Sequence, residues 1–122
     1  MKRPAFLHDP SPLQFLRLAV VKAELGESAA TTYRAIAAGM LPRPIELGPN
    51  RKGWPRYEVD AINRARLAGK SIDEQRAIAA SLQSSRKRLA SATTSEIHAF
   101  VRELLEHRGS DEKPSRRGKV SL

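Results

Sequence analysis

The sequence predicts a mainly α-helical protein with one small β-hairpin, and three observations lead to this prediction. Several stretches place apolar residues three and four positions apart, as on one face of a helix, most clearly within residues 97–105. Residues 42–56 are instead interrupted by proline and glycine, as in short strands and turns. The chain has 122 residues, enough for one modest core. We expect an extended lead-in (1–14), a small folded domain (15–69), a helical extension (70–109) and a disordered basic tail (110–122).

Charge and cysteine content narrow the class of protein. The formal net charge is +9 and the isoelectric point is about 10.7, which favours a polyanionic partner, most commonly nucleic acid. The chain contains no cysteine, which excludes disulfides and thiolate metal or redox sites. No segment has the pattern of a secretory leader or the apolar length of a membrane span. We therefore expect a cytoplasmic protein that does not contact a membrane.

The N-terminal part is expected to supply a strand and a short helix. Residues 15–18 alternate apolar and polar side chains, as in an edge strand. Residues 20–25 are expected to form a helix that directs Val21 and Leu25 inward. Gly26 then marks a tight bend before the next helix.

A second helix is expected to begin after Ser28, whose hydroxyl can accept a hydrogen bond from a backbone N–H of the first turn. The apolar stripe that we expect to face the core comprises Tyr33, Ile36, Ala37 and Met40. The opposite face carries Ala29, Ala30, Thr32 and Arg34. Such a helix can enter a DNA major groove, where Arg34 can reach a phosphate or a guanine. An ordinary surface helix has the same stripe, so this segment alone leaves both interpretations open.

A basic hairpin is expected to follow the second helix. The expected order is an extended segment at Pro42 to Pro44, a strand at 45–47, a turn at 48–53 and a return strand at 54–56. The two glycines that flank the turn have phosphate-loop spacing, but Trp54 and Pro55 follow them where that loop needs Lys and then Ser or Thr. A nucleotide-binding loop is therefore excluded. Trp54 is expected to pack over the core rather than to stack on a base.

Basic residues are concentrated around this helix and hairpin. Residues 34–56 hold five basic residues and one acidic residue, whereas residues 71–108 are nearly balanced in charge. A basic two-stranded ribbon beside a helix suited to the major groove is typical of a winged helix-turn-helix DNA-binding domain. The candidate DNA-binding residues are Ser28, Ala29, Ala30, Thr32, Tyr33 and Arg34 in the recognition helix, and Arg43, Asn50, Arg51, Lys52 and Arg56 in the wing and its flank. Solvated surface charge is the competing interpretation for the wing residues.

Three further helices are expected after the hairpin. The first covers residues 57–68 and is ended by Gly69. Capping boxes open the other two, at Ser71 for a helix that runs to about Ala90 and at Thr93 for a helix that ends at Gly109. The apolar face of the last helix comprises Ile97, Phe100, Val101, Leu104 and Leu105. We expect this face to pack on the first domain; the alternative is contact with a second copy in a homo-oligomer.

A set of residues between Leu16 and Ala68 relates the chain to a known family. These residues are Arg17, Leu18, Val21, Gly26, Ser28, Thr31, Tyr33, Arg34, Gly39, Pro42, Pro44, Leu47, Gly48, Gly53, Trp54 and Glu58 to Ala61. In their order and spacing the sequence resembles the AlpA-like branch of the MerR-type winged-helix proteins, which includes phage and integrative-element excisionases. Ala29 stands where many relatives place Arg, and Ile62 replaces a usual Trp.

The resemblance implies a small protein whose second helix lies in the DNA major groove while the wing touches the minor groove or the backbone. Excisionases of this type are implied to bend DNA at attachment sites and to bias an integrase toward excision. We therefore expect a sequence-specific double-stranded DNA-binding protein of a mobile element that acts as an excisionase. The alternatives are a transcriptional regulator of the same family and a small terminase-like DNA-packaging or oligomeric scaffold protein.

An enzyme is not expected from this sequence. The three histidines, His8, His98 and His107, lie far apart and lack metal-ligand spacing. Asp73 and Glu74 fall in the first turn of a helix, where acidic residues interact favourably with the helix dipole. No nucleophile is paired with a base, so we expect no catalytic residue, no metal and no cofactor.

Overall fold

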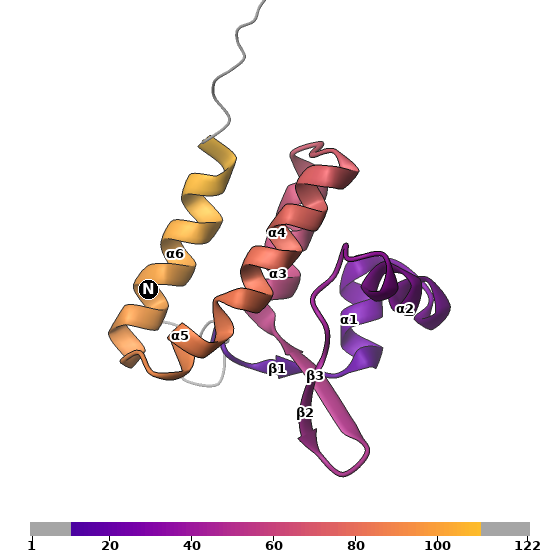
Figure 1. Cartoon of the computed structure of the whole chain (residues 1–122), viewed down its shortest axis with the longest axis horizontal. Coiled ribbons are helices and arrows are strands. Elements are labelled where there is room, and N and C mark those ends of the chain that lie inside the picture. The colour runs from indigo at the N-terminus through magenta and orange to yellow at the C-terminus, as the bar shows by residue number, and fades with distance from the viewer. Residues whose placement is uncertain (1–10, 111–122) are drawn as a thin grey trace, which may run out of the picture.

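Six helices and a three-stranded antiparallel sheet make up the part of the chain that the computed structural model describes, residues 11–110 (Figure 1). In chain order the elements are β1 (Phe15–Leu16), α1 (Leu18–Leu25), α2 (Ala29–Ala37), β2 (Ile45–Gly48), β3 (Arg51–Pro55), α3 (Arg56–Leu67), α4 (Ile72–Ser84), α5 (Arg86–Ala90) and α6 (Thr94–Ser110). Side chains are described through residue 106. The mainly helical class is confirmed, and the parts of the predicted lead-in and tail at residues 1–10 and 111–122 lie outside the described residues.

The turn between α1 and α2 follows the prediction closely. Gly26 ends α1 in the left-handed conformation, with φ of 68°, and its N–H points back to the carbonyls of the last turn. Ser28 caps α2, because its Oγ accepts a hydrogen bond from the N–H of Thr31 at 3.1 Å. At its other end α2 stops at Ala37, earlier than the predicted stripe through Met40, because Gly39 reverses the chain with φ of 79°.

The face of α2 that turns inward differs from the prediction. Thr32 is fully buried, whereas Tyr33 is 53% exposed and Ala37 is exposed. The Thr32 hydroxyl donates toward the Ser28 carbonyl at 3.0 Å and the Glu27 carboxylate at 3.1 Å, so this polar group is satisfied inside. The predicted stripe was therefore wrong by one position along the helix: Thr32, Ala35 and Ile36 face inward, and their small or branched side chains suit a close approach to the neighbouring elements.

The sheet has the strand order β1–β3–β2, with β3 in the centre. Phe15 and Leu16 pair with the end of β3, and β2 and β3 form a hairpin, as predicted. The return strand begins at Arg51, three residues earlier than predicted, so Arg51 and Lys52 belong to β3 rather than to the turn. Gly53 leaves room for its neighbours on both sides, since an added Cβ would stand 2.9 Å from Cδ1 of Leu47 and 3.0 Å from the Leu16 carbonyl oxygen. Trp54 is buried, as predicted, and its indole N–H donates to the Pro42 carbonyl at 2.8 Å.

Helix α3 is the central element of the core. It carries the predicted inward residues Val59, Ile62 and Ala65, and it packs against α1, α4 and α6. A single cluster of buried side chains extends from Leu16 to Val101. The core is therefore continuous across residue 69, where the sequence suggested a boundary between a domain and an extension.

The region predicted as one helix from Ser71 to Ala90 is divided in two. The capping box at Ser71 is present, with Glu74 as its partner, but α4 ends at Ser84 and α5 begins at Arg86. Neither proline nor glycine marks the break at Ser85. The helix is interrupted at Ser85, and after this break Leu89 is buried and Arg86 pairs with a residue of α3.

Helix α6 packs along α3, the first of the two arrangements expected for its apolar face. Ile97 and Val101 are buried, and Phe100 meets the ring of Tyr57 edge-on at 6.2 Å between centroids. Leu104 and Leu105 are half-buried against the same core. The capping box at Thr93 is present, whereas Gly109 does not end the helix, which is described through Ser110.

Candidate nucleic-acid interface

The exposed face of α2 is a short surface of small, aromatic and basic side chains. Ala30, Tyr33, Arg34 and Ala37 lie at helical spacing and are all exposed. Arg34 donates from Nη2 to the Thr31 hydroxyl at 3.2 Å. This hydrogen bond holds the guanidinium near the first turn of α2, and the Arg34 side chain remains exposed. Tyr33, which the sequence placed in the core stripe and also among the DNA contacts, belongs to this outer face.

Three other candidates on α2 do not present free side chains outward. The Ser28 hydroxyl is engaged in capping and donates to the Thr31 hydroxyl at 3.0 Å. Ala29 is half-buried. Thr32 was predicted as a DNA contact, and this is corrected here because its side chain is enclosed and hydrogen-bonded within the protein.

Long-range hydrogen bonds hold the chain just before and just after α2. From α3, Asn63 donates to the Glu24 carbonyl at 2.9 Å, and Arg66 donates to the Leu25 carbonyl and to the Glu27 carboxylate, each at 3.0 Å. From α4, Arg76 donates to the Ala38 carbonyl, one of the orphan acceptors after α2, at 2.9 Å. The exposed face of α2 is thus oriented by both α3 and α4.

The tip of the β2–β3 hairpin presents polar and basic side chains. Asn50 lies at the tip with φ of 59°, a left-handed conformation that Asn tolerates better than most residues. Arg51 folds back over Gly48 and donates to the Leu47 carbonyl at 3.3 Å. Lys52 lies directly across the ladder from Glu46. Asn50, Arg51 and Lys52 are all exposed, so the structure brings these three candidates together.

The other two basic candidates lie away from the hairpin tip. Arg43 is exposed in the segment between α2 and β2. Arg56 is half-buried at the start of α3, where its Nε donates to the Gln14 side chain at 3.1 Å. The candidates therefore form three groups: the outer face of α2, the hairpin tip, and flanking residues nearer the body of the molecule.

A buried ion pair supports Arg43 and was not expected from the sequence. Arg86 donates to the carboxylate of Glu58, which is fully buried on α3, at 2.7 and 2.8 Å. The same Arg86 Nη2 donates to the Arg43 carbonyl at 2.7 Å. Burial raises the pKa of Glu58 above its ordinary value, and the hydrogen bonds and charge of Arg86 oppose that shift. Glu58 and Arg86 are 28 residues apart, and only the unusual placement of an acid among apolar residues in the third helix could have signalled the pair.

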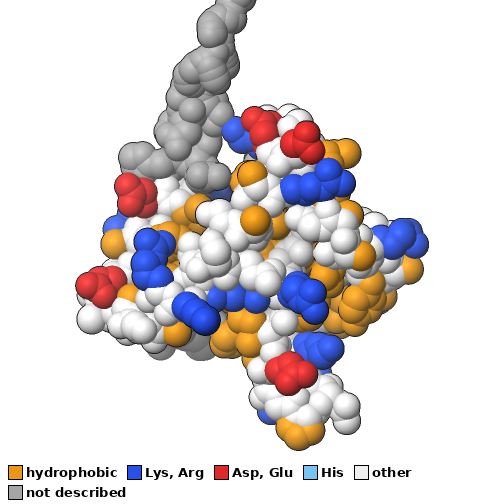
Figure 2. All heavy atoms as spheres, viewed as in Figure 1, with side chains coloured by type: hydrophobic (Ala, Val, Ile, Leu, Met, Phe, Trp, Pro, Cys, Tyr) orange, Lys and Arg blue, Asp and Glu red, His pale blue; other side chains and the backbone are white. Residues whose placement is uncertain are grey.

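The charge is unevenly distributed over the surface. Figure 2 shows basic side chains across the middle of the face that carries α4 and α5 and near the base of the hairpin, with acidic side chains at the edges of this view and on the hairpin. The hairpin projects from the body, and α2 lies beside α1 on the same half of the molecule (Figure 1). Positive potential of this kind attracts polyanions at moderate ionic strength.

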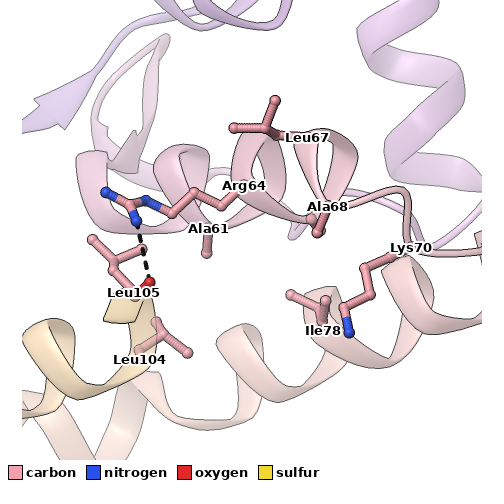
Figure 3. A pocket seen from close by; sticks show the side chains of 9 residues that line it. Ala61, Arg64, Leu67, Ala68, Lys70, Ile78, Leu104 and Leu105 are labelled. Carbon is pink, nitrogen blue, oxygen red and sulfur yellow. Dashed lines mark hydrogen bonds between the residues drawn. The ribbon is translucent and has the colours of Figure 1, made fainter. Parts of the chain in front are cut away.

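A separate apolar pocket of about 200 Å³ lies between α3, α4 and α6 (Figure 3). Ala61, Ala68, Ile78 and Leu104 point into it, while Arg64 crosses its edge and donates to the Leu105 carbonyl at 3.2 Å. It includes no residue of α2 or of the hairpin.

Neither a metal centre nor a membrane span is found in the part of the chain that the structure describes. No three histidine or acidic side chains converge there as metal ligands. None of the described helices combines the length and apolarity needed to cross a bilayer. Comparisons with family models, with curated proteins and with solved structures find no match to this chain.

Proposed function

We propose that this protein binds double-stranded DNA as a winged helix-turn-helix protein. In this proposal α2 enters the major groove with Ala30, Tyr33, Arg34 and Ala37 facing the bases, and the β2–β3 hairpin acts as the wing on the adjacent backbone or minor groove. The observation that carries the proposal is the pairing of a short, exposed, weakly polar helix with a hairpin whose tip bears Arg51 and Lys52. The net charge of +9 supports a polyanionic partner.

The hydrogen bonds that flank α2 support this assignment over a plain surface helix. Hydrogen bonds from Asn63, Arg66 and Arg76 anchor the chain on both sides of the helix. A reading helix must be held in a defined orientation, because base edges are recognised through directional hydrogen bonds.

The excisionase role rests on the family resemblance of residues 16–68. We propose that the DNA is an attachment site of a mobile element, that binding bends it, and that an integrase is the protein partner. A transcriptional regulator would use the same surface, so the two roles differ in the site bound rather than in the DNA-binding residues. Gel-shift analysis with attachment-site and promoter fragments shows which site is preferred, and placing that site at varied positions in a fragment measures the bend.

The experiment that tests DNA binding is a titration of labelled duplex with the full chain over a salt series. Each phosphate contact contributes about 0.9 to the slope of log K against log salt. Arg51→Ala combined with Lys52→Ala is expected to lower that slope by up to about 1.8 and to weaken binding to all sequences. The matched control removes two charges elsewhere, with Lys22→Ala and Arg102→Ala, and should leave the slope nearer its original value. Equal slopes for the hairpin variant and the unaltered protein would contradict a wing contact.

A further inference from the structure

An open groove of about 550 Å³ runs between the end of α2 and the α4–α5 segment. Ile36, Gly39 and Arg43 line one wall, and Gln83, Ser84 and Lys87 line the other. Its cationic side chains, Arg43 and Lys87, stand on opposite walls, and both are exposed. None of the residues that line the groove is acidic.

The two walls are joined by hydrogen bonds that fix their separation. The Gln83 side chain accepts from the Arg43 N–H at 3.0 Å, and Arg86 donates to the Arg43 carbonyl at 2.7 Å. Arg86 is itself anchored by the buried Glu58. Both backbone polar groups of Arg43 are hydrogen-bonded to the opposite wall. The backbone of Arg43 is therefore held in place at the rim of the groove, and its side chain extends from there.

The three consecutive basic residues of α5 point in different directions, because neighbouring residues on a helix are about 100° apart. Arg86 turns inward to Glu58, Lys87 lines the groove, and Arg88 lies over the ring of Phe100 with 5.1 Å between its guanidinium carbon and the ring centroid. Helix α5 therefore does not present a continuous cationic face. Of the three charged side chains, only that of Lys87 lines the groove, which Arg43 also lines.

We propose that this groove binds the phosphodiester backbone of the DNA that flanks the α2 site, with Arg43 and Lys87 contacting phosphates from its two walls. The inference rests on the proposed DNA-binding function and extends the interface to the C-terminal helices. It is supported by proximity and charge: Ile36 and Gly39 at the C-terminal end of α2 line the groove, and its charged side chains are both cationic. A helix seated in a major groove has the sugar-phosphate backbone at its sides, where cationic side chains position the protein without reading sequence.

The adjacent residues Lys87 and Arg88 provide a matched test. Lys87→Gln and Arg88→Gln each remove one charge from the same helix, and only the first removes it from the groove. We expect Lys87→Gln to lower the slope of log K against log salt by about 0.9 and to weaken binding to specific and random duplexes alike. Arg88→Gln is expected to leave the slope unchanged, and Lys87→Arg is expected to retain it. Circular dichroism of each variant confirms that the fold is retained.

The outcomes separate this inference from the function on which it rests. If the unaltered chain forms no complex with duplex DNA at low salt, the proposed function fails and the groove proposal fails with it. If the unaltered chain binds DNA but Lys87→Gln and Arg88→Gln have the same slope, the groove is not a phosphate site and the α2 and hairpin contacts stand alone. A loss confined to Lys87→Gln supports the groove.

Discussion

Arg86 holds the buried carboxylate of Glu58 with two hydrogen bonds, from Nη2 to Oε1 at 2.7 Å and from Nε to Oε2 at 2.8 Å. The pair joins α5 to α3, and through the Arg43 carbonyl it also fixes the segment that leads from α2 to β2. A buried ion pair contributes little net stability over an apolar pair of similar size, but removing one partner leaves an uncompensated buried charge. The ion pair therefore ties the position of α5 to that of α3 in the core.

Arg86→Ala is expected to destabilise the protein by about 3 kcal/mol, because Glu58 would remain buried without its partner. Urea unfolding measures the change, and Lys87→Ala on the same helix is the control with an equal loss of charge. A similar free energy of unfolding for the two variants would show that the ion pair does not hold the helix.

Tyr57 is expected to make stability fall at alkaline pH. Burial, followed by the neighbouring Glu58 carboxylate, raises the pKa of Tyr57 from 10.0 to about 12. The unfolded chain then releases this proton at lower pH than the folded protein, so the stability present below pH 10 is lost as the pH rises toward 12. A shift of about two pKa units corresponds to a loss of roughly 3 kcal/mol. Unfolding of Tyr57→Phe, which cannot ionise, should depend less on pH in this range; identical curves for both proteins would contradict the shift.

Thr32→Val is expected to destabilise the protein by about 1 kcal/mol, since the hydroxyl that bonds to Glu27 and Ser28 is lost while the shape is kept. Thr94→Val, at an exposed position, is the control. Thermal or urea unfolding measures both. A variant at Thr32 that keeps its stability but loses preference for one base pair would restore the original expectation that this residue reads DNA.

Arg34→Ala is expected to cost roughly 1 to 3 kcal/mol of binding free energy at the preferred sequence if the guanidinium reads a base. The loss should be concentrated at one base pair, which competition with single-pair variants of the site reveals. Tyr33→Ala, on the same exposed face, tests whether the aromatic side chain contributes at a neighbouring position. Equal loss across random duplexes would instead assign Arg34 to the backbone.

Features determined by neighbouring residues could be predicted from the sequence. The caps at Ser28, Ser71 and Thr93 depend on residues three positions further along the chain, and the structure has all three. The hairpin follows from the prolines and glycines around it, and Trp54 is buried because a single large indole beside a sheet has most to gain from leaving water. These parts of the candidate site required no knowledge of the rest of the fold.

Features determined by distant residues could not be predicted in this way. The predicted and observed stripes on α2 share Ile36, and the choice that buries Thr32 and exposes Tyr33 depends on Glu27 and on the packing of neighbouring helices. The break at Ser85 has no local signal, because the contacts that accompany it are made with α3. For the same reason the proposed phosphate contact of Lys87 could be inferred only from the three-dimensional arrangement.

The central claim is that the outer face of α2 and the hairpin tip contact the same duplex, and amide chemical-shift mapping tests it most directly. The full isotope-labelled chain is titrated with a short duplex at low salt. The account predicts that the largest shift changes cluster in residues 30–38 and 49–52, with smaller changes near Arg43 and Lys87. The absence of any complex, or changes confined to the pocket between α3, α4 and α6, would contradict it.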